Sequence, residues 1–430
     1  MNRCEVTVVG AGPAGVAAAL VLARAGVDVI VLERGERPGT KNVMGGILYP
    51  TEFEKLLPDF PKGAPIERPI TQERFWLMDE STVVDLGVTA AEWKQHPHGF
   101  SVLRAKFDPW FAQQAKAAGA LIVPNTTVTE LLQDENGKVI GVRTNRPDGD
   151  LYADVVVLAD GVNSLLAEQI GLHPRWKPDQ VAVGVIQLFT LPEEEINQRF
   201  GIKSDEGLEI AAYGGATGGL MGQAFLYTDK SALSVGLGVL LSDLMEAQIT
   251  PYQLLDRFIQ HPAIAPLLEG AQRREYMAHL MPEGGYDAVP KLYGDGVVVV
   301  GDAAMFVNPF TRQGMNQAVF SGRTAAEAIL QARQLGEYDA RALSEYGERM
   351  RNSFVLQDLR QFREALPYLE QHPAFLRELL PLLTHGAKDL LSADGRPIGR
   401  KIDQLMQQAF AKQGRLGLAR DAYGLWRRVR

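Results

Sequence analysis

Two distant stretches of the chain share one hydrophobic pattern, a short apolar run followed by a segment of small residues. Near the start, Glu5–Val9 leads through a glycine-rich turn into the alanine-rich segment Ala17–Ala25. Much later, the four valines Val297–Val300 lead through a polar loop into Gln317–Leu330. A short continuous apolar run bounded by turn residues is typical of a strand buried on both faces, as in parallel sheets covered by helices. The pattern predicts an α/β fold.

The middle of the chain has a different pattern. Short apolar segments, Val181–Thr190, Ala224–Tyr227 and Ala232–Leu240, are separated by turns, which predicts an antiparallel sheet inserted into the α/β domain. The glycine-rich segment Tyr213–Gly222 is interpreted as a hairpin, with a flexible apolar lip as the alternative. Leu241–Leu255 is predicted to be helical. After residue 345, apolar positions recur at helical spacing, which predicts a helical C-terminal region.

The first predicted strand ends in a glycine motif. Its order is strand, Gly10-x-Gly12-x-x-Gly15, helix, a second strand over Val27–Leu32 and then Glu33. Gly10 permits a tight turn, Gly12 lets backbone N–H groups approach a diphosphate, and Gly15 lets the helix pack close to the sheet. The helix N-terminus favours phosphate charge, and Glu33 can accept hydrogen bonds from a ribose. The full order predicts a dinucleotide site rather than a structural turn, without distinguishing FAD from NAD.

A carboxylate follows the second buried strand. Asp302 comes soon after Val297–Val300, and Gly314, Met315 and Asn316 begin the next helix. Because ligands bind parallel sheets at the carboxyl ends of the strands, we expect Asp302 in the same crevice as the first glycine loop. There it can accept hydrogen bonds from ribityl hydroxyls, while the helix N-terminus offers backbone donors to a flavin edge. The alternative for Asp302 alone is a capping or turn residue.

Together these segments resemble flavoproteins of the p-hydroxybenzoate-hydroxylase-like FAD fold. A third element, Ala153–Leu172, is similar to the DG motif of that fold, in which an Asp-Gly pair lies near the flavin. Leu32–Pro50 and Met281–Ala304 resemble electron-transfer-flavoprotein:quinone oxidoreductases, particularly the bacterial FixC-type subunit, and the likeness covers nearly the whole chain. It implies bound FAD and electrons that arrive from an electron-transfer flavoprotein rather than from a small organic substrate.

The resemblance implies contacts with each part of FAD. The diphosphate loop corresponds to Gly10, Gly12, Pro13, Ala14 and Gly15. The adenosine side corresponds to Glu33, Arg34 and, through its backbone, Val128. The flavin side corresponds to Gly45, Gly46, Arg104, Asp160, Gly161, Asp302, Gly314, Met315 and Asn316. No side chain is implied as a catalytic acid or base, because the flavin itself carries the redox chemistry.

The implied architecture is a Rossmann-like, discontinuous FAD-binding domain with an inserted substrate domain. The FAD-binding domain is expected over residues 1–55, 100–178 and 286–340. An antiparallel-sheet substrate or quinone domain is expected over 56–99 and 179–285, and a helical C-terminal region over 341–430.

The composition of the chain limits the classes of partner and cofactor that we expect. The net charge of −8 argues against general nucleic-acid binding, which usually shows a basic domain. The single cysteine, Cys4, cannot supply the four thiolates of an iron–sulfur cluster, unlike the fused members of the resembled family. The FixC-type arrangement, with a separate small ferredoxin-like iron–sulfur protein, is therefore implied. No histidine cluster with metal-ligand spacing is found in the sequence, so no metal is expected.

The expected location is the cytoplasm, either as a soluble protein or in peripheral contact with the cytoplasmic face of the membrane. One thiol suits a reducing compartment, no signal peptide precedes the first strand, and no apolar stretch approaches the ~18 residues of a transmembrane helix. The tail from Arg396 to Arg430 is basic. It is interpreted either as a dock for an acidic ferredoxin or anionic lipid, or as a solvated helix face with cations at its C-terminal end.

Three functions stay open. The resemblance favours electron transfer from electron-transfer flavoprotein subunits towards quinone, in a complex that can also bifurcate electrons. A substrate-transforming flavoenzyme, either an aromatic hydroxylase or a geranylgeranyl-reductase-like enzyme, would share all three flavin motifs. A flavin-binding assembly module without enzymatic activity is the third.

Overall fold

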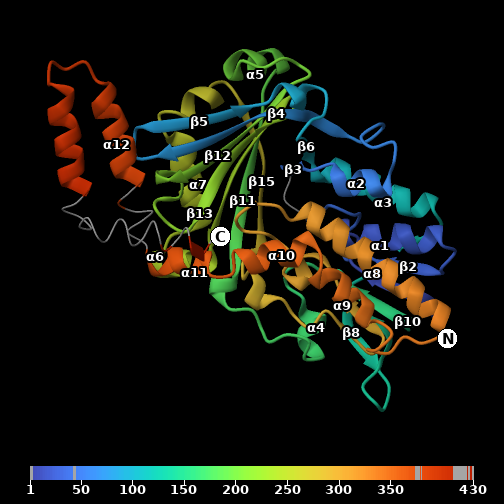
Figure 1. Cartoon of the computed structure of the whole chain (residues 1–430). Coiled ribbons are helices and arrows are strands. Elements are labelled where there is room, and N and C mark those ends of the chain that lie inside the picture. The colour runs from blue at the N-terminus through green and yellow to red at the C-terminus, as the bar shows by residue number, and fades with distance from the viewer. Residues whose placement is uncertain are drawn as a thin grey trace. The chain divides into compact units, whose positions relative to one another are not determined.

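The computed structural model describes residues 3–41, 45–372, 378, 380–409, 424, 427 and 428, and the chain divides into two compact units (Figure 1). Unit 1 comprises Met1–Glu67, Val102–Val181 and Leu280–Arg360. Unit 2 comprises Arg68–Ser101, Ala182–His279 and Gln361–Arg430. Both units are discontinuous, because segments of each alternate along the sequence.

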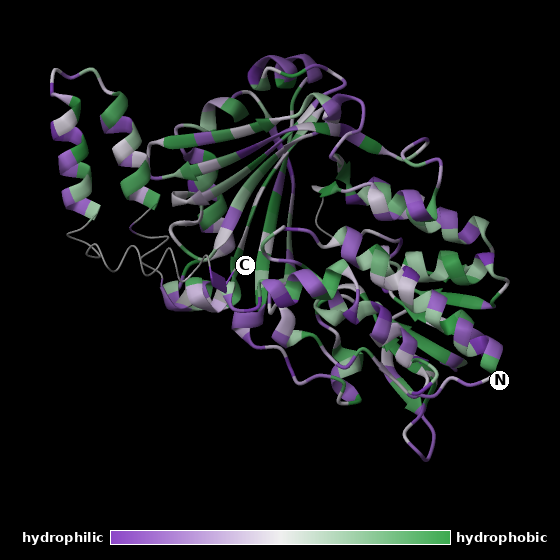
Figure 2. Ribbon diagram, viewed as in Figure 1, coloured by the Kyte–Doolittle hydropathy of each residue, from purple (hydrophilic) through white to green (hydrophobic). Residues whose placement is uncertain are grey.

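Unit 1 contains a largely parallel sheet whose central path runs β16-β17-β10-β1-β2-β7. The parallel strands are β1 (Arg3–Val9), β2 (Val29–Leu32), β7 (Leu121–Val123), β10 (Asp150–Leu158) and β17 (Val297–Val299). The antiparallel strands are β16 (Tyr293–Gly294), β8 (Val128–Gln133) and β9 (Val139–Thr144). The central strands are buried, and their apolar residues are green in Figure 2. The predicted α/β fold is confirmed.

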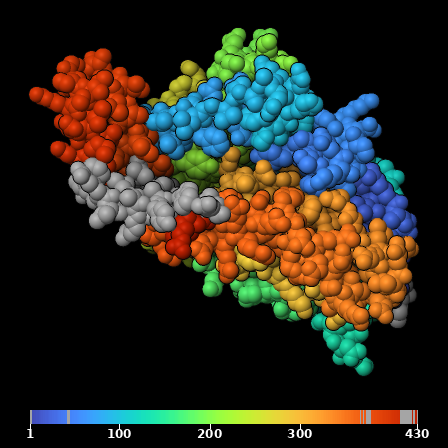
Figure 3. All heavy atoms as spheres, in the orientation of Figure 1, coloured from blue at the N-terminus to red at the C-terminus, as the bar shows by residue number. Residues whose placement is uncertain are grey.

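Small residues allow the helices of unit 1 to pack closely. The helices are α1 (Pro13–Arg24), α2 (Thr51–Leu56), α3 (Arg104–Ala117), α4 (Leu165–Gln169), α8 (Met315–Leu335), α9 (Ser344–Arg351) and α10 (Phe354–Gln361). α1 packs against α8 and α3. At the α1–α8 crossing, a methyl group on Gly322 would lie 2.0 Å from the Ala14 carbonyl oxygen, so only glycine fits there. Residues of α8, α9 and α10 form a continuous orange surface in Figure 3.

Unit 2 is built on a sheet in which antiparallel pairs predominate among the strand pairs described. Its strands follow the order β15 (Gln272–Pro282), β11 (Val181–Thr190), β14 (Ala232–Leu240), β13 (Gly222–Thr228), β12 (Gly207–Gly214) and β4 (Ile66–Met78), with β5 (Val83–Thr89) beside β4. β12 and β4 are parallel, whereas β11–β14, β14–β13, β13–β12 and β4–β5 are antiparallel. The bounds of β11 and β14 are those predicted. A further strand is β6 (Gly99–Leu103), and β3 (Gly45–Leu48) belongs to the residues of unit 1.

Helices α5 (Glu193–Phe200), α6 (Leu241–Ala247) and α7 (Pro251–Gln260) contribute to the hydrophobic core of unit 2. The segment Leu241–Leu255, predicted to be helical, is divided between two helices. Gln248 adopts a left-handed conformation with φ of 50°, which ends α6. Thr250 then caps α7, because its hydroxyl accepts a hydrogen bond from the Gln253 N–H at 3.3 Å, and a proline occupies the first turn.

The C-terminal part of unit 2 is helical, as predicted, where it is described. α11 (Ala365–Gln371) and α12 (Leu380–Leu391) are followed by a helical segment over 398–409. Lys401 is buried and its ammonium donates to the carbonyl oxygens of Asp389 and Ser392 at 2.7 and 2.5 Å, so it caps the end of α12. Lys412, Arg415, Arg420 and Arg430 of the basic tail lie outside the described residues. In the described part of the chain, no helix has the length and apolar composition to cross a bilayer.

Candidate functional site

The motif loops of unit 1 start from neighbouring strands. In the sheet register Val9 pairs with Leu158 and with Leu32, and Leu158 pairs with Val299. The residues that follow these strand ends, among them Gly10 and Glu33, therefore lie in one row along the carboxyl edge of the sheet. Parallel sheets bind ligands at this edge. The glycine loop, the DG loop (residues 160–164) and the loop after β17 are brought together there.

The glycine loop is shaped by two close approaches and one open position. Gly10 has φ of +102°, and a methyl group on it would lie 2.3 Å from the Ala159 carbonyl oxygen. A methyl group on Gly15 would lie 2.0 Å from the Gly10 carbonyl oxygen. By contrast, nothing lies within 4 Å of the corresponding position on Gly12, which precedes Pro13 at the start of α1. Open space beside a helix N-terminus suits a phosphate group.

Glu33 links the glycine loop to the segment after β2. Its buried carboxylate accepts hydrogen bonds from the backbone N–H groups of Ala11 at 2.9 Å and Gly35 at 2.7 Å. A carboxylate has about four lone-pair sites, so two are left for ribose hydroxyls. Thr126 donates its N–H to the Glu33 carbonyl oxygen at 2.9 Å, which places the segment before Val128 beside this loop.

Asp302 is joined to the glycine loop through Gly301. Gly301 has φ of +63°, and a methyl group on it would lie 2.8 Å from the Ala14 side chain. Its N–H donates to the Ser321 hydroxyl at 2.9 Å, which ties the loop to α8. The Asp302 residue is half-buried. Burial raises the pKa of Asp302 to about 6, and the charge of Arg104 opposes that rise.

Arg104 is itself held by an ion pair. Its guanidinium donates to both carboxylate oxygens of Asp108, one turn later on α3, at 2.7 and 2.8 Å. A bidentate pair of this kind fixes the orientation of the arginine. Asp108 was not among the predicted site residues, although the four-residue spacing on a helix is a signal for such a pair.

The DG loop is tied to the loop that carries Asp302. The Ser164 hydroxyl donates to the Ala303 carbonyl oxygen at 3.2 Å. Gly161 has φ of +78°, and nothing lies within 4 Å of a methyl group placed on it. Burial raises the pKa of Asp160 to about 6, while backbone N–H groups and the charge of Arg34 lower it. The Asp160 Oδ1 atom is buried without a hydrogen-bond partner.

The loop before α8 presents further buried polar atoms. The Asn308 carboxamide oxygen accepts the N–H groups of Phe310 and Thr311 at 2.9 and 3.2 Å, which shapes the turn. Asn316, just after Gly314 and Met315, donates its Nδ2 to Gln313 at 3.0 Å. Within the described residues, the buried atoms left without a hydrogen-bond partner in this loop and the first turn of α8 are Asn308 Nδ2, Thr311 Oγ1, Asn316 Oδ1 and Gln317 Oε1. Gln317, Asn308 and Thr311 were not predicted as site residues.

Gly45 and Gly46 lie in β3. Nothing lies within 4 Å of a methyl group placed on Gly46, so its face is open. The adjacent residues Asn42, Val43 and Met44, part of the segment that carried the family resemblance, lie outside the described residues. Among the contacts described, none joins Gly45 or Gly46 to the three motif loops.

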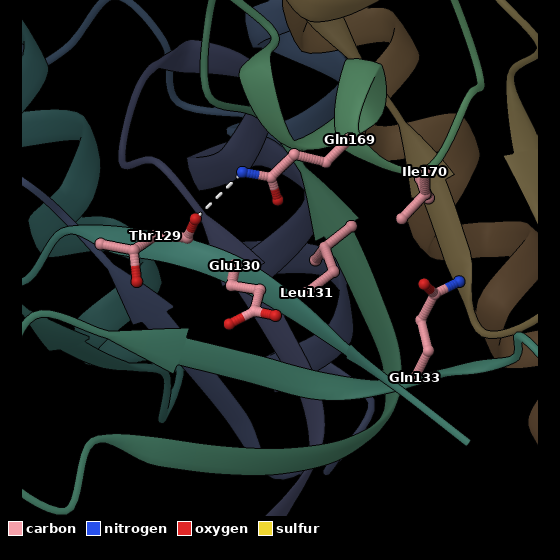
Figure 4. A pocket seen from close by; sticks show the side chains of 6 residues that line it. All are labelled: Thr129, Glu130, Leu131, Gln133, Gln169 and Ile170. Atoms are coloured by element: carbon pink, nitrogen blue, oxygen red, sulfur yellow. Dashed lines mark hydrogen bonds between the residues drawn. The ribbon is translucent and has the colours of Figure 1, made fainter. Parts of the chain in front are cut away.

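A separate concavity of about 410 Å³ lies beside β8 and α4 (Figure 4). Its lining consists of Thr129, Glu130, Leu131, Gln133, Gln169 and Ile170. Gln169 Nε2 donates to the Thr129 carbonyl oxygen at 3.1 Å across one side of it. None of these residues belongs to the motif loops. Elsewhere too, the described residues include no cluster of three or more His, Cys, Asp or Glu side chains able to hold a metal.

The residues of the three loops fit an extended dinucleotide. The open side of Gly12 and the α1 N-terminus suit a diphosphate, and the buried oxygens of Asp160 and Asn316 lack the donors that ribityl hydroxyls and a flavin ring supply. Such unsatisfied buried groups are costly unless a ligand completes their hydrogen bonds. The fold and the site thus define an FAD-binding protein.

Comparison with known families agrees with this class. Residues 3–196 match the FAD binding domain family, and residues 366–430 match the ETF-QO/FixC family C-terminal domain. Protein FixC of Bradyrhizobium diazoefficiens is 44% identical over 98% of this chain and 98% of its own length. The probable electron transfer flavoprotein-quinone oxidoreductase YdiS of Escherichia coli is 38% identical over 98% and 97%. The chain belongs to the ETF-QO/FixC family and is an FAD-dependent oxidoreductase, as the sequence predicted.

Solved structures share the fold at low sequence identity. A geranylgeranyl bacteriochlorophyll reductase-like protein from Thermoplasma acidophilum matches with a TM-score of 0.73 and 21% identity, over 96% of this chain and 98% of that protein. The myxobacterial chondrochloren halogenase CndH matches with a TM-score of 0.65 and 20% identity, over 87% and 91%. These matches show the fold alone.

Proposed function

We propose that this chain accepts electrons from an electron-transfer flavoprotein and passes them towards a quinone. The observation that carries the proposal is the 38–44% identity, over nearly the full chain, to FixC proteins and to a probable electron transfer flavoprotein-quinone oxidoreductase. The match of residues 366–430 to the C-terminal domain of the same family supports it. FAD supplies the redox chemistry when bound, since a flavin exchanges electrons without a side-chain acid or base.

In this proposal the chain holds FAD across the three loops of unit 1. Gly10, Gly12, Pro13, Ala14 and Gly15 bind the diphosphate, and Glu33, Arg34 and Val128 bind the adenosine. The flavin end is bound by Gly45, Gly46, Arg104, Asp160, Gly161, Asp302, Gly314, Met315 and Asn316. The contacts of Gly301 with Ala14 and of Ser164 with Ala303 support a single continuous site, because they join all three loops.

We further propose a separate ferredoxin-like iron–sulfur protein as a partner in an electron-bifurcating complex on the cytoplasmic membrane face. The 430 residues contain one cysteine, so the chain cannot ligate a cluster through four thiolates of its own. Cys4 is also buried and burial raises its pKa, which disfavours the thiolate that a metal requires.

The test is reduction of the purified holoprotein in a stopped-flow spectrometer. We expect reduced electron-transfer flavoprotein to bleach the bound flavin, and a soluble quinone to restore the oxidised spectrum. NADPH together with an aromatic compound serves as the control donor and should not bleach it. Bleaching by NADPH with the aromatic compound, and none by reduced electron-transfer flavoprotein, contradicts the proposal and favours the hydroxylase or reductase alternative. Retention of FAD with no electron exchange to any acceptor also contradicts it and favours a flavin-binding assembly module. Stoichiometric iron and sulfide in the isolated chain would contradict the separate iron–sulfur partner.

A further inference from the structure

Two aromatic side chains outside the predicted site hold the DG loop from behind. The His173 Nε2 atom lies 3.0 Å from the Ser164 carbonyl oxygen. The Trp176 indole N–H donates to the Val162 carbonyl oxygen at 2.7 Å. The two rings are stacked, with centroids 3.8 Å apart and planes 14° from parallel. This stacked pair, called the clamp, reaches the loop through the Trp176 hydrogen bond and the Nε2–oxygen contact of His173.

The DG loop needs such support, because part of its backbone is outside regular structure. Gly161 and Ser164 both have positive φ, +78° and 45°. The Ser164 carbonyl oxygen also accepts the Glu168 N–H at 3.1 Å, so it is the point where the clamp, the loop and α4 meet. From the same residue, the hydroxyl bond to Ala303 extends the support to the loop of Asp302.

The clamp is anchored on its other side. The carbonyl oxygen of Leu172 accepts a hydrogen bond from the Lys291 N–H at 3.0 Å. The N–H of Leu172 donates to the Ala167 carbonyl oxygen at 2.9 Å. His173 is buried, with 5% of its surface exposed. A buried imidazole fixed by backbone bonds on the preceding residue has little freedom to move, so it can hold the loop rather than follow it.

We propose that His173 and Trp176 are positioning residues for FAD. They fix the carbonyl groups of Val162 and Ser164, and through them the orientation in which Asp160 and Gly161 meet the cofactor. In this proposal the two side chains act on the cofactor through the loop backbone. The inference rests on the proposed placement of FAD against the DG loop.

The chemistry of the His173 bonds supplies a matched pair of variants. A carbonyl oxygen only accepts hydrogen bonds, so the bond to Ser164 requires a hydrogen on Nε2. The other ring nitrogen, Nδ1, lies 2.6 Å from the Pro174 carbonyl oxygen in the adjacent residue. A glutamine places its amide nitrogen near the Nε2 position, whereas an asparagine places it near Nδ1. His173→Gln therefore keeps the bond to the loop, and His173→Asn loses it.

The experiment measures the FAD dissociation constant of each variant by titrating deflavinated protein and following flavin fluorescence. His173→Asn should raise the dissociation constant about five- to tenfold, the equivalent of one hydrogen bond. His173→Gln should stay within about twofold of wild type. Trp176→Phe, which keeps an aromatic ring but loses the donor, should weaken binding as His173→Asn does. Visible circular dichroism of the bound flavin should change in the two weakened variants only.

His385→Asn is the control, because this histidine is 68% exposed and lies in unit 2. The clamp is refuted if His173→Asn and His173→Gln have the same effect, or if both His173→Asn and Trp176→Phe bind FAD as wild type does. Should one weakened variant fail to fold, the other provides the test. If the variants change FAD binding as expected but electron-transfer flavoprotein does not reduce the bound flavin, the proposed function is refuted and this inference stands. If electron-transfer flavoprotein reduces the flavin but the variants leave FAD binding unchanged, only this inference is refuted.

Discussion

At the scale of single residues, the site is made of groups that are costly to bury. The pKa values of Asp160 and Asp302 are both raised to about 6, and desolvation by burial is the largest cause in each. A raised carboxyl pKa means that the folded protein disfavours the charged form. Above pH 6 these two residues therefore destabilise the protein without FAD. Residues that reduce stability in this way are retained where a ligand uses them.

Asp302→Asn should stabilise the apoprotein and weaken FAD binding. The folded pKa lies above the ordinary 3.8, so the contribution of Asp302 to stability is present at low pH and lost as the pH rises through 6. The neutral amide removes this loss, so the free energy of unfolding of the apoprotein should rise by about 1–3 kcal/mol above pH 7. It also removes a charged acceptor from the proposed site. Thermal unfolding of deflavinated protein from pH 4.5 to 8, together with FAD titration, measures both effects.

The matched control is Asp59→Asn, because Asp59 is exposed in the same unit. It should change neither the pH profile nor the FAD affinity. An Asp302→Asn apoprotein that is less stable than wild type at pH 8, or that binds FAD equally well, would show that this carboxylate is structural.

At the scale of elements, strand β4 is fixed by a buried arginine. The Arg68 side chain is fully buried, and its guanidinium donates to the carbonyl oxygens of Asp229, Lys203 and Glu206 at 2.8, 2.9 and 2.9 Å. These carbonyls belong to the turns at the ends of β12 and β13. One side chain thus holds two loop regions of unit 2 against β4, in addition to the backbone pairing of β12 with β4.

Replacing Arg68 by methionine should cost about 3–5 kcal/mol of stability. Methionine fills much of the volume but leaves several buried carbonyl oxygens without donors, and each unsatisfied group costs about 1–3 kcal/mol. Arg74→Met on the same strand is the control. Arg74 forms a partly exposed ion pair with Asp85 at 3.0 Å, which should contribute less than about 1 kcal/mol. Denaturant unfolding followed by circular dichroism compares the two, and equal losses would contradict the role given to Arg68.

At the scale of the whole molecule, the proposed cofactor site draws on distant parts of the sequence within unit 1. Residues 10–15, 160–164 and 301–317 all lie in this unit, although the sheet of unit 2 is built largely from segments inserted between them. A ligand that binds the native state stabilises the unit that contains its site, by about 2.7 kcal/mol at a hundredfold excess over the dissociation constant.

Hydrogen exchange should therefore respond to FAD in unit 1. We expect slower amide exchange in the three loops when FAD is added to deflavinated protein, and no change in residues 380–409 of unit 2. Mass spectrometry of peptides from both regions measures this in a single sample, with AMP as the control ligand, which lacks the flavin. Protection that appears in 380–409 but not in the loops would contradict the assigned site.

The sequence alone determined the local chemistry of the site. The apolar runs of β1 and β17 and the glycines after them predicted an α/β fold with a dinucleotide site, and the family resemblance implied FAD. The fold and the cofactor are both confirmed. This was possible because a buried strand and a glycine-dependent turn are encoded in residues close together in the chain. The break at Gln248 was missed, since a non-glycine residue with positive φ leaves little trace in a hydrophobic pattern.

Only the tertiary structure decided which strands are neighbours. β10 lies between β1 and β17, and this order makes Ser164 a neighbour of Ala303 and allows Gly301 to reach Ala14. The tertiary structure also revealed the clamp formed by His173 and Trp176, two residues that belong to no sequence motif. Local periodicity shows what each segment can form, but the order and register of strands depend on packing between residues far apart in the chain. The partners of a buried polar group are fixed by that packing.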